Sequence, residues 1–332
     1  MKKLIFLFPI LLMMMSCNSD DSESLPVDNI SDLKLENLNF LSSNIPEDFY
    51  DDLTFVDELT GYAVSRIGKI VKTIDGGTTW TVLNSAANFP LKKIQFIDQY
   101  NGYIIGGDDT GSYILKTINA GNTWSIINLN TVENGSPNGM YFKNKDVGFI
   151  TGNRFFKKTA DGGQTWTNVL PNSIEDYQRV NFNINKTLGY VTFNSSNYLK
   201  TNDGGSTWQL VEERADYRFS EIYFVENQVF FKSNLNVVNL NFNKSIEIPS
   251  SAHKLLYLTV DKCIGIGQHY EIGFLPYGDV LFTNDNWDAF LQRSYQPASE
   301  SMVFTAIAKM SKHKTMMLGT GQIYTKIVVL TY

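Results

Sequence analysis

Apolar residues along the chain fall in short runs in which hydrophobic and polar positions nearly alternate. Residues 69–73, 113–117 and 198–201 are three such runs, rich in β-branched and aromatic side chains. Gly or Asn-Gly pairs lie at the ends of many of these runs. Because side chains of a strand point alternately to its two faces, this pattern predicts short β-strands. No segment beyond the N-terminal run shows the spacing of an amphipathic helix, so the pattern predicts an all-β protein.

An eight-residue motif recurs four times without gaps, as Thr-x-Asp-Gly-Gly-x-Thr-Trp with small variations. Its first, third, fifth and eighth positions are Thr73, Asp75, Gly77 and Trp80; Thr117, Asn119, Gly121 and Trp124; Thr159, Asp161, Gly163 and Trp166; and Thr201, Asp203, Gly205 and Trp208. A shortened fifth copy contains Thr283, Asp285 and Trp287. The five tryptophans are separated by 44, 42, 42 and 79 residues. The last gap is nearly double, so we expect a copy near 237–239 that has lost the motif.

A weaker repeat precedes each motif, in which an aromatic residue lies six residues before a Gly. It is seen as Phe55 to Gly61, Phe96 to Gly102 and Phe142 to Gly148, while Asn183 to Gly189 keeps the spacing with Phe182 displaced by one. Similar segments begin at Phe224, around Leu258 and around Ile307, from which a step of 18 reaches Thr325 as Phe55 reaches Thr73. Seven copies of about 40–45 residues, with about four short strands each, predict a seven-bladed β-propeller with four-stranded blades; six blades is the alternative.

A propeller of this kind closes when one blade is built from both ends of the chain. Residues 33–40 show partial alternation, and the chain ends in the apolar segment 322–330. We expect these two segments to share the last blade, with the N-terminal one supplying its missing strand. Closure of the ring would remove the exposed sheet edges that make all-β chains prone to aggregate.

The residue types that recur in the motif have a structural explanation. The short carboxylate of Asp75, Asp161 or Asp203 can accept hydrogen bonds from the backbone of a tight turn between the third and fourth strands, and the Asn119 amide oxygen can do the same. The Gly at the fifth position permits a positive φ. We expect the first-position Thr and the Trp to make contacts between blades. The aspartates are therefore predicted to be structural and not catalytic.

The octad resembles the Asp-box, or BNR, repeat found in sialidases, sortilin-type receptors and other propellers. With the preceding Phe-x-Asp and Gly-Tyr positions, residues 45–332 are similar to propellers of the photosystem II assembly-factor type, which also occur in secreted bacterial proteins without a photosynthetic role. The resemblance implies the fold. It does not imply one function, because propellers host many unrelated activities.

The N-terminus has the form of a secretion signal. Lys2 and Lys3 precede an apolar run from Leu4 to Met15, and Ser16-Cys17 resembles the end of a bacterial lipobox. We therefore expect a signal peptide over 1–16, acylation of Cys17, a flexible acidic tether over 17–31 and a propeller over 32–332. This predicts an outer-membrane lipoprotein, either periplasmic or exposed on the cell surface. An ordinary secreted protein with an incidental Cys17 is the alternative.

Composition and charge narrow the class of partner. The chain is 43% hydrophobic and 13% aromatic, which excludes disorder, and its net charge of −6 makes nucleic acid an improbable ligand. With Cys17 lipidated, Cys263 has no disulfide partner, and its apolar surroundings predict a buried, unreactive thiol. Beyond the signal, no apolar run approaches the ~20 residues needed to cross a bilayer.

Evidence for catalysis is scarce. The three histidines, His253, His269 and His313, are too scattered for a metal or acid–base site, so no metal or cofactor is expected. Asp108 and Asp109 could contact a cation, but a polar hairpin turn is the simpler interpretation. The enzymatic alternative is a glycoside hydrolase of the sialidase kind, which would need three arginines around a substrate carboxylate. The chain's six arginines lack that context.

Binding is the function that remains. Tyr177, Arg179, Arg214, Tyr217 and Arg218 give two neighbouring blades a Tyr/Arg-rich composition typical of interfaces, although they could equally be ordinary strand-edge residues. We expect a non-enzymatic, monomeric scaffold on the envelope that recognises a protein or glycan partner through its loops, with a membrane contact only through the lipid anchor.

Overall fold

The structure is a computed structural model. It describes residues 38–108, 111–129, 136–170, 175–212, 217–233, 236–241, 244–248, 252–269, 277–284, 291–295, 302–321 and 325–332. The propeller lies within Asp32–Tyr332. The signal peptide, the tether and Cys17 expected at the N-terminus fall outside the described residues, as do Asp109, Arg214, Asp285 and Trp287.

Twenty-eight β-strands and no helix occur in the described residues, and the strands form seven antiparallel four-stranded sheets. In the first four blades, each sheet uses four consecutive strands. Blade 1 contains β2 (Tyr50–Phe55), β3 (Gly61–Ser65), β4 (Ile70–Thr73) and β5 (Thr81–Leu83); blade 2 contains β6 (Leu91–Phe96), β7 (Gly102–Asp108), β8 (Gly111–Thr117) and β9 (Ser125–Asn128); blade 3 contains β10 (Pro137–Phe142), β11 (Gly148–Gly152), β12 (Phe155–Thr159) and β13 (Thr167–Asn168); blade 4 contains β14 (Tyr177–Phe182), β15 (Gly189–Phe193), β16 (Tyr198–Thr201) and β17 (Gln209–Val211).

Blades 5 and 6 follow the same order, and blade 7 combines three C-terminal strands with one from the N-terminus. Blade 5 contains β18 (Glu221–Val225), β19 (Gln228–Lys232), β20 (Asn236–Asn239) and β21 (Lys244–Glu247); blade 6 contains β22 (Ala252–Tyr257), β23 (Cys263–His269), β24 (Tyr277–Thr283) and β25 (Leu291–Tyr295); blade 7 contains β26 (Met302–Ser311), β27 (Lys314–Gly321), β28 (Thr325–Thr331) and β1 (Leu38–Leu41). The prediction of seven blades is confirmed, and the six-bladed alternative is wrong.

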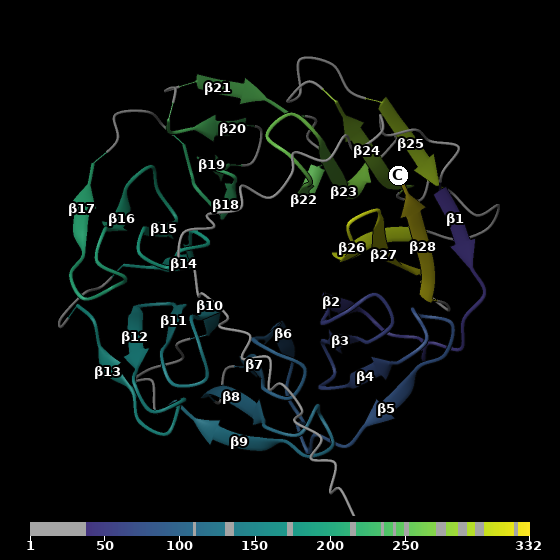
Figure 1. The fold of residues 1–332 in the computed structure, drawn as a ribbon, viewed down its shortest axis with the longest axis horizontal. Helices are drawn as coiled ribbons and strands as arrows, with labels where there is room; N and C mark the ends of the chain where they lie inside the picture. The colour runs from purple at the N-terminus through teal and green to yellow at the C-terminus, as the bar shows by residue number, and fades with distance from the viewer. Residues whose placement is uncertain are drawn as a thin grey trace, which may run out of the picture. The chain divides into compact units, whose positions relative to one another are not determined.

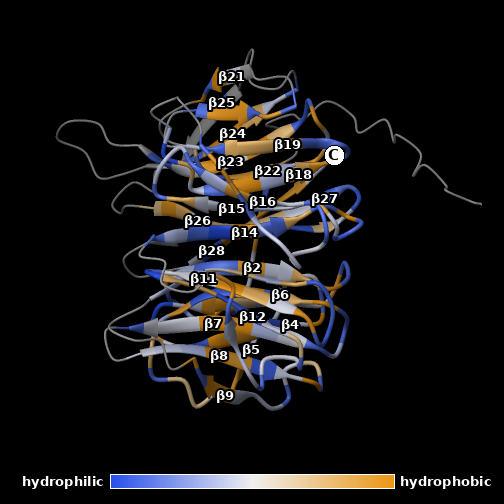
Figure 2. Cartoon of the chain, turned by 90° about the vertical axis from the view of Figure 1, so that its left-hand side faces the viewer, coloured by the Kyte–Doolittle hydropathy of each residue, from blue (hydrophilic) through white to orange (hydrophobic). Residues whose placement is uncertain are grey.

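The first strand of each sheet lies nearest the central axis. Figure 1 shows β2, β6, β10, β14, β18, β22 and β26 around the centre and β5, β9, β13, β17, β21, β25 and β1 at the periphery. Viewed from the side, the strands run between two edges formed by the connecting turns (Figure 2). One face therefore carries the turns that follow the innermost strands, together with the Asp-box turns, and the opposite face carries the remaining connections.

Ring closure occurs as expected. Strand β1 pairs antiparallel with β28, from Leu38 opposite Leu330 to Leu41 opposite Ile327. The pairing makes the N-terminal strand the outermost strand of blade 7. The prediction that both ends of the chain share the last blade is confirmed.

The core lies mainly between neighbouring blades. One cluster combines Tyr62 and Val64 of blade 1 with Ile94 and Ile104 of blade 2, all of them buried. Because each sheet buries both faces against its neighbours, the second strands read as continuous buried runs, as in Gly61–Ser65. No helix in the described part of the chain is long and apolar enough to cross a membrane.

The structure explains the displaced aromatic residue of blade 4. Phe182 lies opposite Gly189, and the turn between them contains one more residue than the equivalent turn of blade 1. In blade 7 the phasing assigned from Ile307 was wrong. Residues 327–330 bury their side chains in the same order as Ile70–Thr73, so Leu330, and not Thr325, is the equivalent of Thr73.

Candidate functional site

The Asp-box is a closed set of hydrogen bonds within one turn. In blade 1 the Thr73 hydroxyl donates to Asp75 Oδ1 (2.8 Å) and accepts from the Gly77 N–H (2.9 Å). Asp75 then accepts from the Thr79 N–H (2.8 Å) and hydroxyl (2.6 Å). The same bonds recur around Asp161 in blade 3 and Asp203 in blade 4.

Asn119 replaces the aspartate in blade 2 and keeps the same geometry. Its Oδ1 accepts from the Thr117 hydroxyl (3.0 Å) and the Thr123 N–H (3.0 Å), and its Nδ2 donates to the Thr123 hydroxyl (2.9 Å). The direction of the last bond is thus the reverse of that in the aspartate boxes. At the fourth and fifth box positions φ is positive, and in blade 2 Ala120 (φ 57°) occupies the first of these.

Blade 5 lacks the Asp-box, and two asparagines make hydrogen bonds at the end of β20 instead. Asn239 Oδ1 accepts from the Asn241 N–H (3.0 Å). Asn241 Oδ1 accepts from the Val229 N–H (2.8 Å). The two amide side chains therefore connect the end of β20 to β19 without the Thr and Asp of the other boxes.

We expected the first-position Thr of each box to contact the neighbouring blade, and this was wrong for blade 1. There the contact is made by Lys72, which precedes Thr73, and by Tyr62. Lys72 of blade 1 and the Tyr62 hydroxyl both donate to the Ala120 carbonyl of blade 2 (2.9 Å each). The Trp80 indole is 4% exposed and donates to the Gly77 carbonyl (2.9 Å), within a cluster that includes Met310 of blade 7. The carboxylate oxygens of the box aspartates, in contrast, accept hydrogen bonds from within their own turns.

Four of the five Tyr/Arg candidates are described, and the structure disperses them. Tyr177 is 1% exposed and lies in the core between blades 3 and 4, while Tyr217 stacks on Phe219 and Arg218 is exposed. Of these four, only Arg179 lines the central channel. Among the other sequence candidates, Thr283 is buried, and Cys263 is buried with the pKa of its thiol raised well above the usual value by desolvation.

The central channel is shaped by a repeated irregularity in the innermost strands. Register shifts occur near the start of six of them, around Asp51, Lys92, Asn138, Gln178–Arg179, His253 and Thr305. A β-bulge inserts an extra residue, so consecutive side chains can point to the same side of the strand. Charged pairs such as Lys92 and Lys93 therefore line the channel together, whereas regular strands would present only one of each pair.

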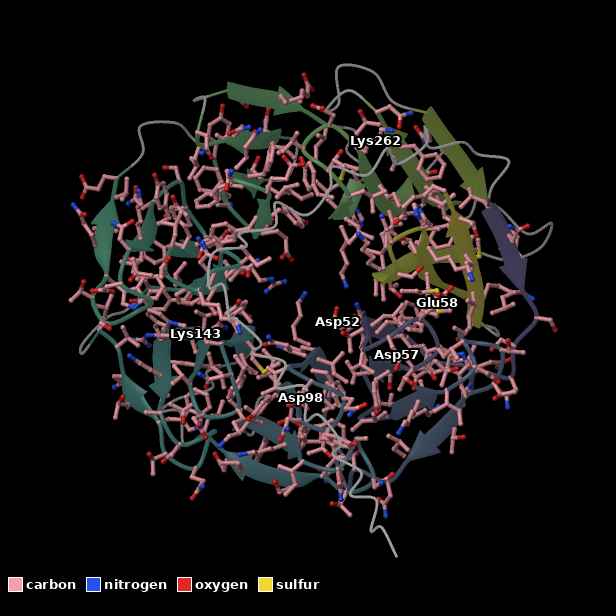
Figure 3. All side chains as sticks on the ribbon, in the orientation of Figure 1. Asp52, Asp57, Glu58, Asp98, Lys143 and Lys262 are labelled. Carbon is pink, nitrogen blue, oxygen red and sulfur yellow. The ribbon has the colours of Figure 1, made fainter. Side chains whose placement is uncertain are left out.

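These side chains form one basic cavity of about 470 Å³ that spans five blades. Its basic lining residues are Arg66, Lys92, Lys93, Arg179 and Lys254, and its acidic one is Asp51. A second cavity shares Asp51, Arg66 and Lys254, and a third shares Lys93 and Arg179. We call the charged residues that line these three cavities the basic channel. Figure 3 shows Asp52 beside the centre of the ring, and Lys93 Nζ lies 4.0 Å from its carboxylate.

Arg179 and Glu221 form a two-pronged ion pair in the channel. Arg179 Nη2 lies 2.8 Å from Glu221 Oε1, and Arg179 Nε lies 3.0 Å from both carboxylate oxygens. Arg179 also donates to the carbonyl of Asn138. Burial by itself would raise the pKa of Glu221, but Arg179, with Lys93 and Lys254, lowers it to about 2. Glu221 is thus held ionised.

Lys254 is the cation most affected by its surroundings. Desolvation, and then the charge of Lys93, lower the pKa of Lys254 to about 8, against the opposing effect of Asp52 and Glu221. Its ammonium donates to the Asp51 carbonyl. Desolvation also lowers the pKa of Lys92, whose ammonium donates to the Ser136 hydroxyl. An added anion would relieve this repulsion, so the channel is suited to bind carboxylates.

Sequence reasoning missed the basic channel, although a signal was present. Asp51, Lys92, Asn138 and Gln178 each lie four residues before the repeat Phe of their blade.

Within the described residues, no group of three or more His, Cys, Asp or Glu side chains is arranged to hold a metal ion. His253 is described, and burial lowers its pKa, but the side chain of His269 is outside the described set.

Comparisons with known proteins agree with the fold and the motif. A family model described as "Photosynthesis system II assembly factor YCF48" matches residues 34–179. A solved structure described as "YCF48 bound to D1 peptide" is similar, with a TM-score of 0.68 and 18% identity over 91% of this chain and 99% of that one. YCF48 from Cyanidioschyzon merolae has a TM-score of 0.67 and 15% identity over 89% of this chain and 98% of that one.

A glycoside hydrolase also shares the architecture. The GH74 xyloglucanase from Xanthomonas campestris has a TM-score of 0.67 and 13% identity over 87% of this chain, which spans only 53% of that enzyme. No curated protein sequence matches the chain.

The fold and the motif together define the class of this protein, a seven-bladed β-propeller of the BNR, or Asp-box, type. Within that class it is similar to the YCF48 type of assembly-factor propeller, as its sequence motif indicated.

Proposed function

We propose that this propeller is a non-enzymatic, monomeric binding scaffold that captures an acidic segment of a partner protein at the basic channel. The single observation that carries the proposal is the convergence of Arg66, Lys92, Lys93, Arg179 and Lys254 on one cavity. The whole chain has a net charge of −6, so this concentration of cations is a local exception. Anionic ligands are attracted to such a focused positive field.

A protein segment suits the cavity better than a glycan. The described residues that line the 470 Å³ cavity include no aromatic side chain, whereas sugar rings are commonly held on aromatic faces. The similar YCF48 structure is described as bound to a peptide. A peptide with acidic side chains or a free carboxylate would pair with the lysines and Arg66.

Glycoside hydrolysis is less compatible with the charges of the channel. A hydrolase needs one carboxyl group with a raised pKa to act as acid. The pKa of Glu221 is instead lowered to about 2, and Asp51 and Asp52 lie beside cations. The hydrolase alternative therefore rests on a shared architecture with GH74 and on no acid–base pair in the described channel.

The location follows from the N-terminal sequence. We expect Cys17 to be acylated and residues 17–31 to tether the propeller to the outer layers of a bacterial envelope. Mass spectrometry of the mature N-terminus tests this expectation. A Cys17→Ala variant should leave the membrane fraction, and a mature N-terminus without an acylated Cys17 would contradict the anchor.

The binding proposal is tested by anisotropy with labelled acidic peptides, run beside a glycan array. Reversing two charges with Lys92→Glu and Lys93→Glu should weaken peptide binding by about tenfold or more, which corresponds to ~1.4 kcal/mol. Lys145→Glu is the matched control, because Lys145 is exposed on the opposite face and, among the described residues, forms its ion pair with the adjacent Asp146. Glycan capture without peptide capture would overturn the proposal, as would glycoside hydrolysis abolished by Asp52→Asn.

A further inference from the structure

Four large apolar side chains are exposed together on the face opposite the basic channel. Leu59 and Tyr100 lie in the turns that follow the innermost strands of blades 1 and 2, and they are 56% and 55% exposed. Ile74 and Ile118 occupy the second position of the Asp-boxes of the same blades, and they are 68% and 67% exposed. We call these four residues the apolar patch.

The repeat itself provides an internal control for the first pair. The carbonyls of Leu59 and Tyr100 accept from the N–H groups of Gly76 and Ala120 (2.9 Å each). In blades 3 and 4 the carbonyls of Asp146 and Thr187 accept the equivalent bonds, from the N–H groups of Gly162 (2.7 Å) and Gly204 (2.8 Å). The turn thus forms equally well with polar side chains at this position.

The second pair shows the same contrast. The box position held by Ile74 and Ile118 is Ala160 in blade 3 and Asn202 in blade 4. All four boxes make the same Thr–Gly hydrogen bond, so isoleucine is not needed for the turn. Folding therefore does not explain the apolar residues at either position, and exposed apolar side chains gathered on neighbouring turns are typical of an interaction site.

The box turn of blade 2, which carries Ile118, lies against blade 1 at the seam between the two blades. Tyr62 and Lys72 of blade 1 both hydrogen-bond to the Ala120 carbonyl in the box turn of blade 2. In Figure 3, Asp57 lies over blade 1 and Asp98 over blade 2, on the same turns as Leu59 and Tyr100.

The charged residues within these four turns are all acidic. They are Asp57, Glu58, Asp75 and Asp98, and residues 56–60, 74–79, 97–101 and 118–123 contain no Lys or Arg. Lys314 of blade 7 pairs with Glu58 (2.7 Å), and Lys72 is directed to a backbone carbonyl, so Asp57, Asp75 and Asp98 remain without a cationic partner in the described residues. Burial would raise the pKa values of Asp57 and Asp98, but backbone N–H donors lower them, so both stay ionised.

We propose that the apolar patch is a second docking surface, which binds a partner-protein segment that presents apolar side chains interspersed with Lys or Arg. The apolar residues supply contact area, and the three unpaired carboxylates select for positive charge. This surface is separate from the basic channel and does not depend on the function proposed for it.

Two other occupants are disfavoured by the same charges. An anionic lipid surface would be repelled by Asp57, Asp75 and Asp98. A second copy that docked by two-fold symmetry would bring the same three carboxylates against themselves.

The test uses the purified mature chain and a labelled Leu/Lys peptide of roughly 18 residues that forms an amphipathic helix. A Leu/Glu peptide of the same length is the charge control. The variant Ile74→Asn with Ile118→Asn copies the residue of blade 4, and Tyr100→Asp copies blade 3. Ile184→Asn is the matched surface control, because Ile184 is 80% exposed in blade 4. Thermal melting of each variant checks that the fold is retained.

The Leu/Lys peptide should bind the native chain, with an affinity that falls about tenfold in the double Asn variant and in Tyr100→Asp but not in Ile184→Asn. Equal affinity in all variants, or equal binding of the Leu/Glu peptide, overturns the proposal. Sedimentation that shows a dimer lost in the double variant would assign the patch to a second copy. Binding to anionic vesicles in preference to the peptide would assign it to a membrane.

Discussion

Tyr103 of blade 2 and Phe142 of blade 3 stack face to face, with ring centroids 3.5 Å apart and an interplanar angle of 6°. The Tyr103 hydroxyl continues across the seam and donates to the Lys145 carbonyl (2.8 Å). The Lys116 ammonium lies 5.7 Å above the Tyr103 ring. Tyr62 and Phe96 repeat the stack between blades 1 and 2, with centroids 4.1 Å apart. The aromatic residues of the weaker sequence repeat therefore form the contact, or joint, between neighbouring blades.

Truncation of a side chain at this joint should destabilise the fold. Phe142 is 1% exposed, and Phe142→Ala should lower the free energy of unfolding by about 3–5 kcal/mol, because a cavity is left between two blades. Tyr103→Phe removes only the hydrogen bond to Lys145 and should cost about 1 kcal/mol. Urea denaturation measures both values, and similar losses for the two variants would contradict the proposed joint.

The box threonines should matter for stability through their hydroxyls. Thr201 is 1% exposed, and Thr201→Val would leave the buried Gly205 N–H without its acceptor, at a cost of about 1–3 kcal/mol. Thr201→Ser keeps the hydroxyl and should retain most of that stability. Asp203→Asn should be tolerated, because Asn119 occupies the same position in blade 2. A Val variant as stable as the Ser variant would rule out this role.

Acid should weaken the boxes. Hydrogen bonds from the Thr165 side chain and backbone, and from Thr159, lower the pKa of Asp161 to about 2. The contribution of Asp161 is thus present above the unfolded-state pKa near 3.9 and is lost as the pH falls towards 2. We expect the native chain to lose its stability advantage over Asp161→Asn between about pH 4 and pH 2. Melting temperatures measured across this range test the prediction, and a constant difference would contradict it.

The Arg179–Glu221 pair should control the charge state of the channel. Glu221→Gln removes a charge-assisted hydrogen bond and should cost about 1.5–3 kcal/mol. Because Glu221 raises the pKa of Lys254, its neutralisation should shift that pKa below about 8. NMR titration of the lysine side chain measures the shift. An upward shift would show that the two groups are not coupled as described.

Closure depends on the N-terminal strand. Deletion of residues 1–41 would remove β1 and leave the β28 edge, from Ile327 to Leu330, without its partner. We expect a lower melting temperature and concentration-dependent aggregation, since an unpaired edge strand is a template for association. A chain that begins at residue 32 keeps β1 and is the control. Equal behaviour of the two chains would show that β1 is dispensable.

The local pattern of this sequence was enough to predict the seven-bladed ring and the shared last blade. Thr73, Asp75 and Gly77 act within one turn, so their spacing specifies their hydrogen bonds wherever the turn lies. The unit recurs along the chain at a nearly constant period, which indicated the number of blades. The strand-like patterns at the two chain ends indicated that β1 closes the ring. The copy without the motif was harder to interpret, because Asn239 and Asn241 make hydrogen bonds at the end of β20 that the spacing of the other copies does not predict.

Tertiary structure alone decided where the charged side chains converge. Lys92, Arg179 and Lys254 come from blades 2, 4 and 6, and a bulge on each innermost strand determines which of two neighbouring residues faces the channel. A one-residue register change is invisible in composition and spacing but reverses the side to which a side chain points. Tyr177 shows the same limit, because its place in the core beside Arg179 in the channel follows from that bulge.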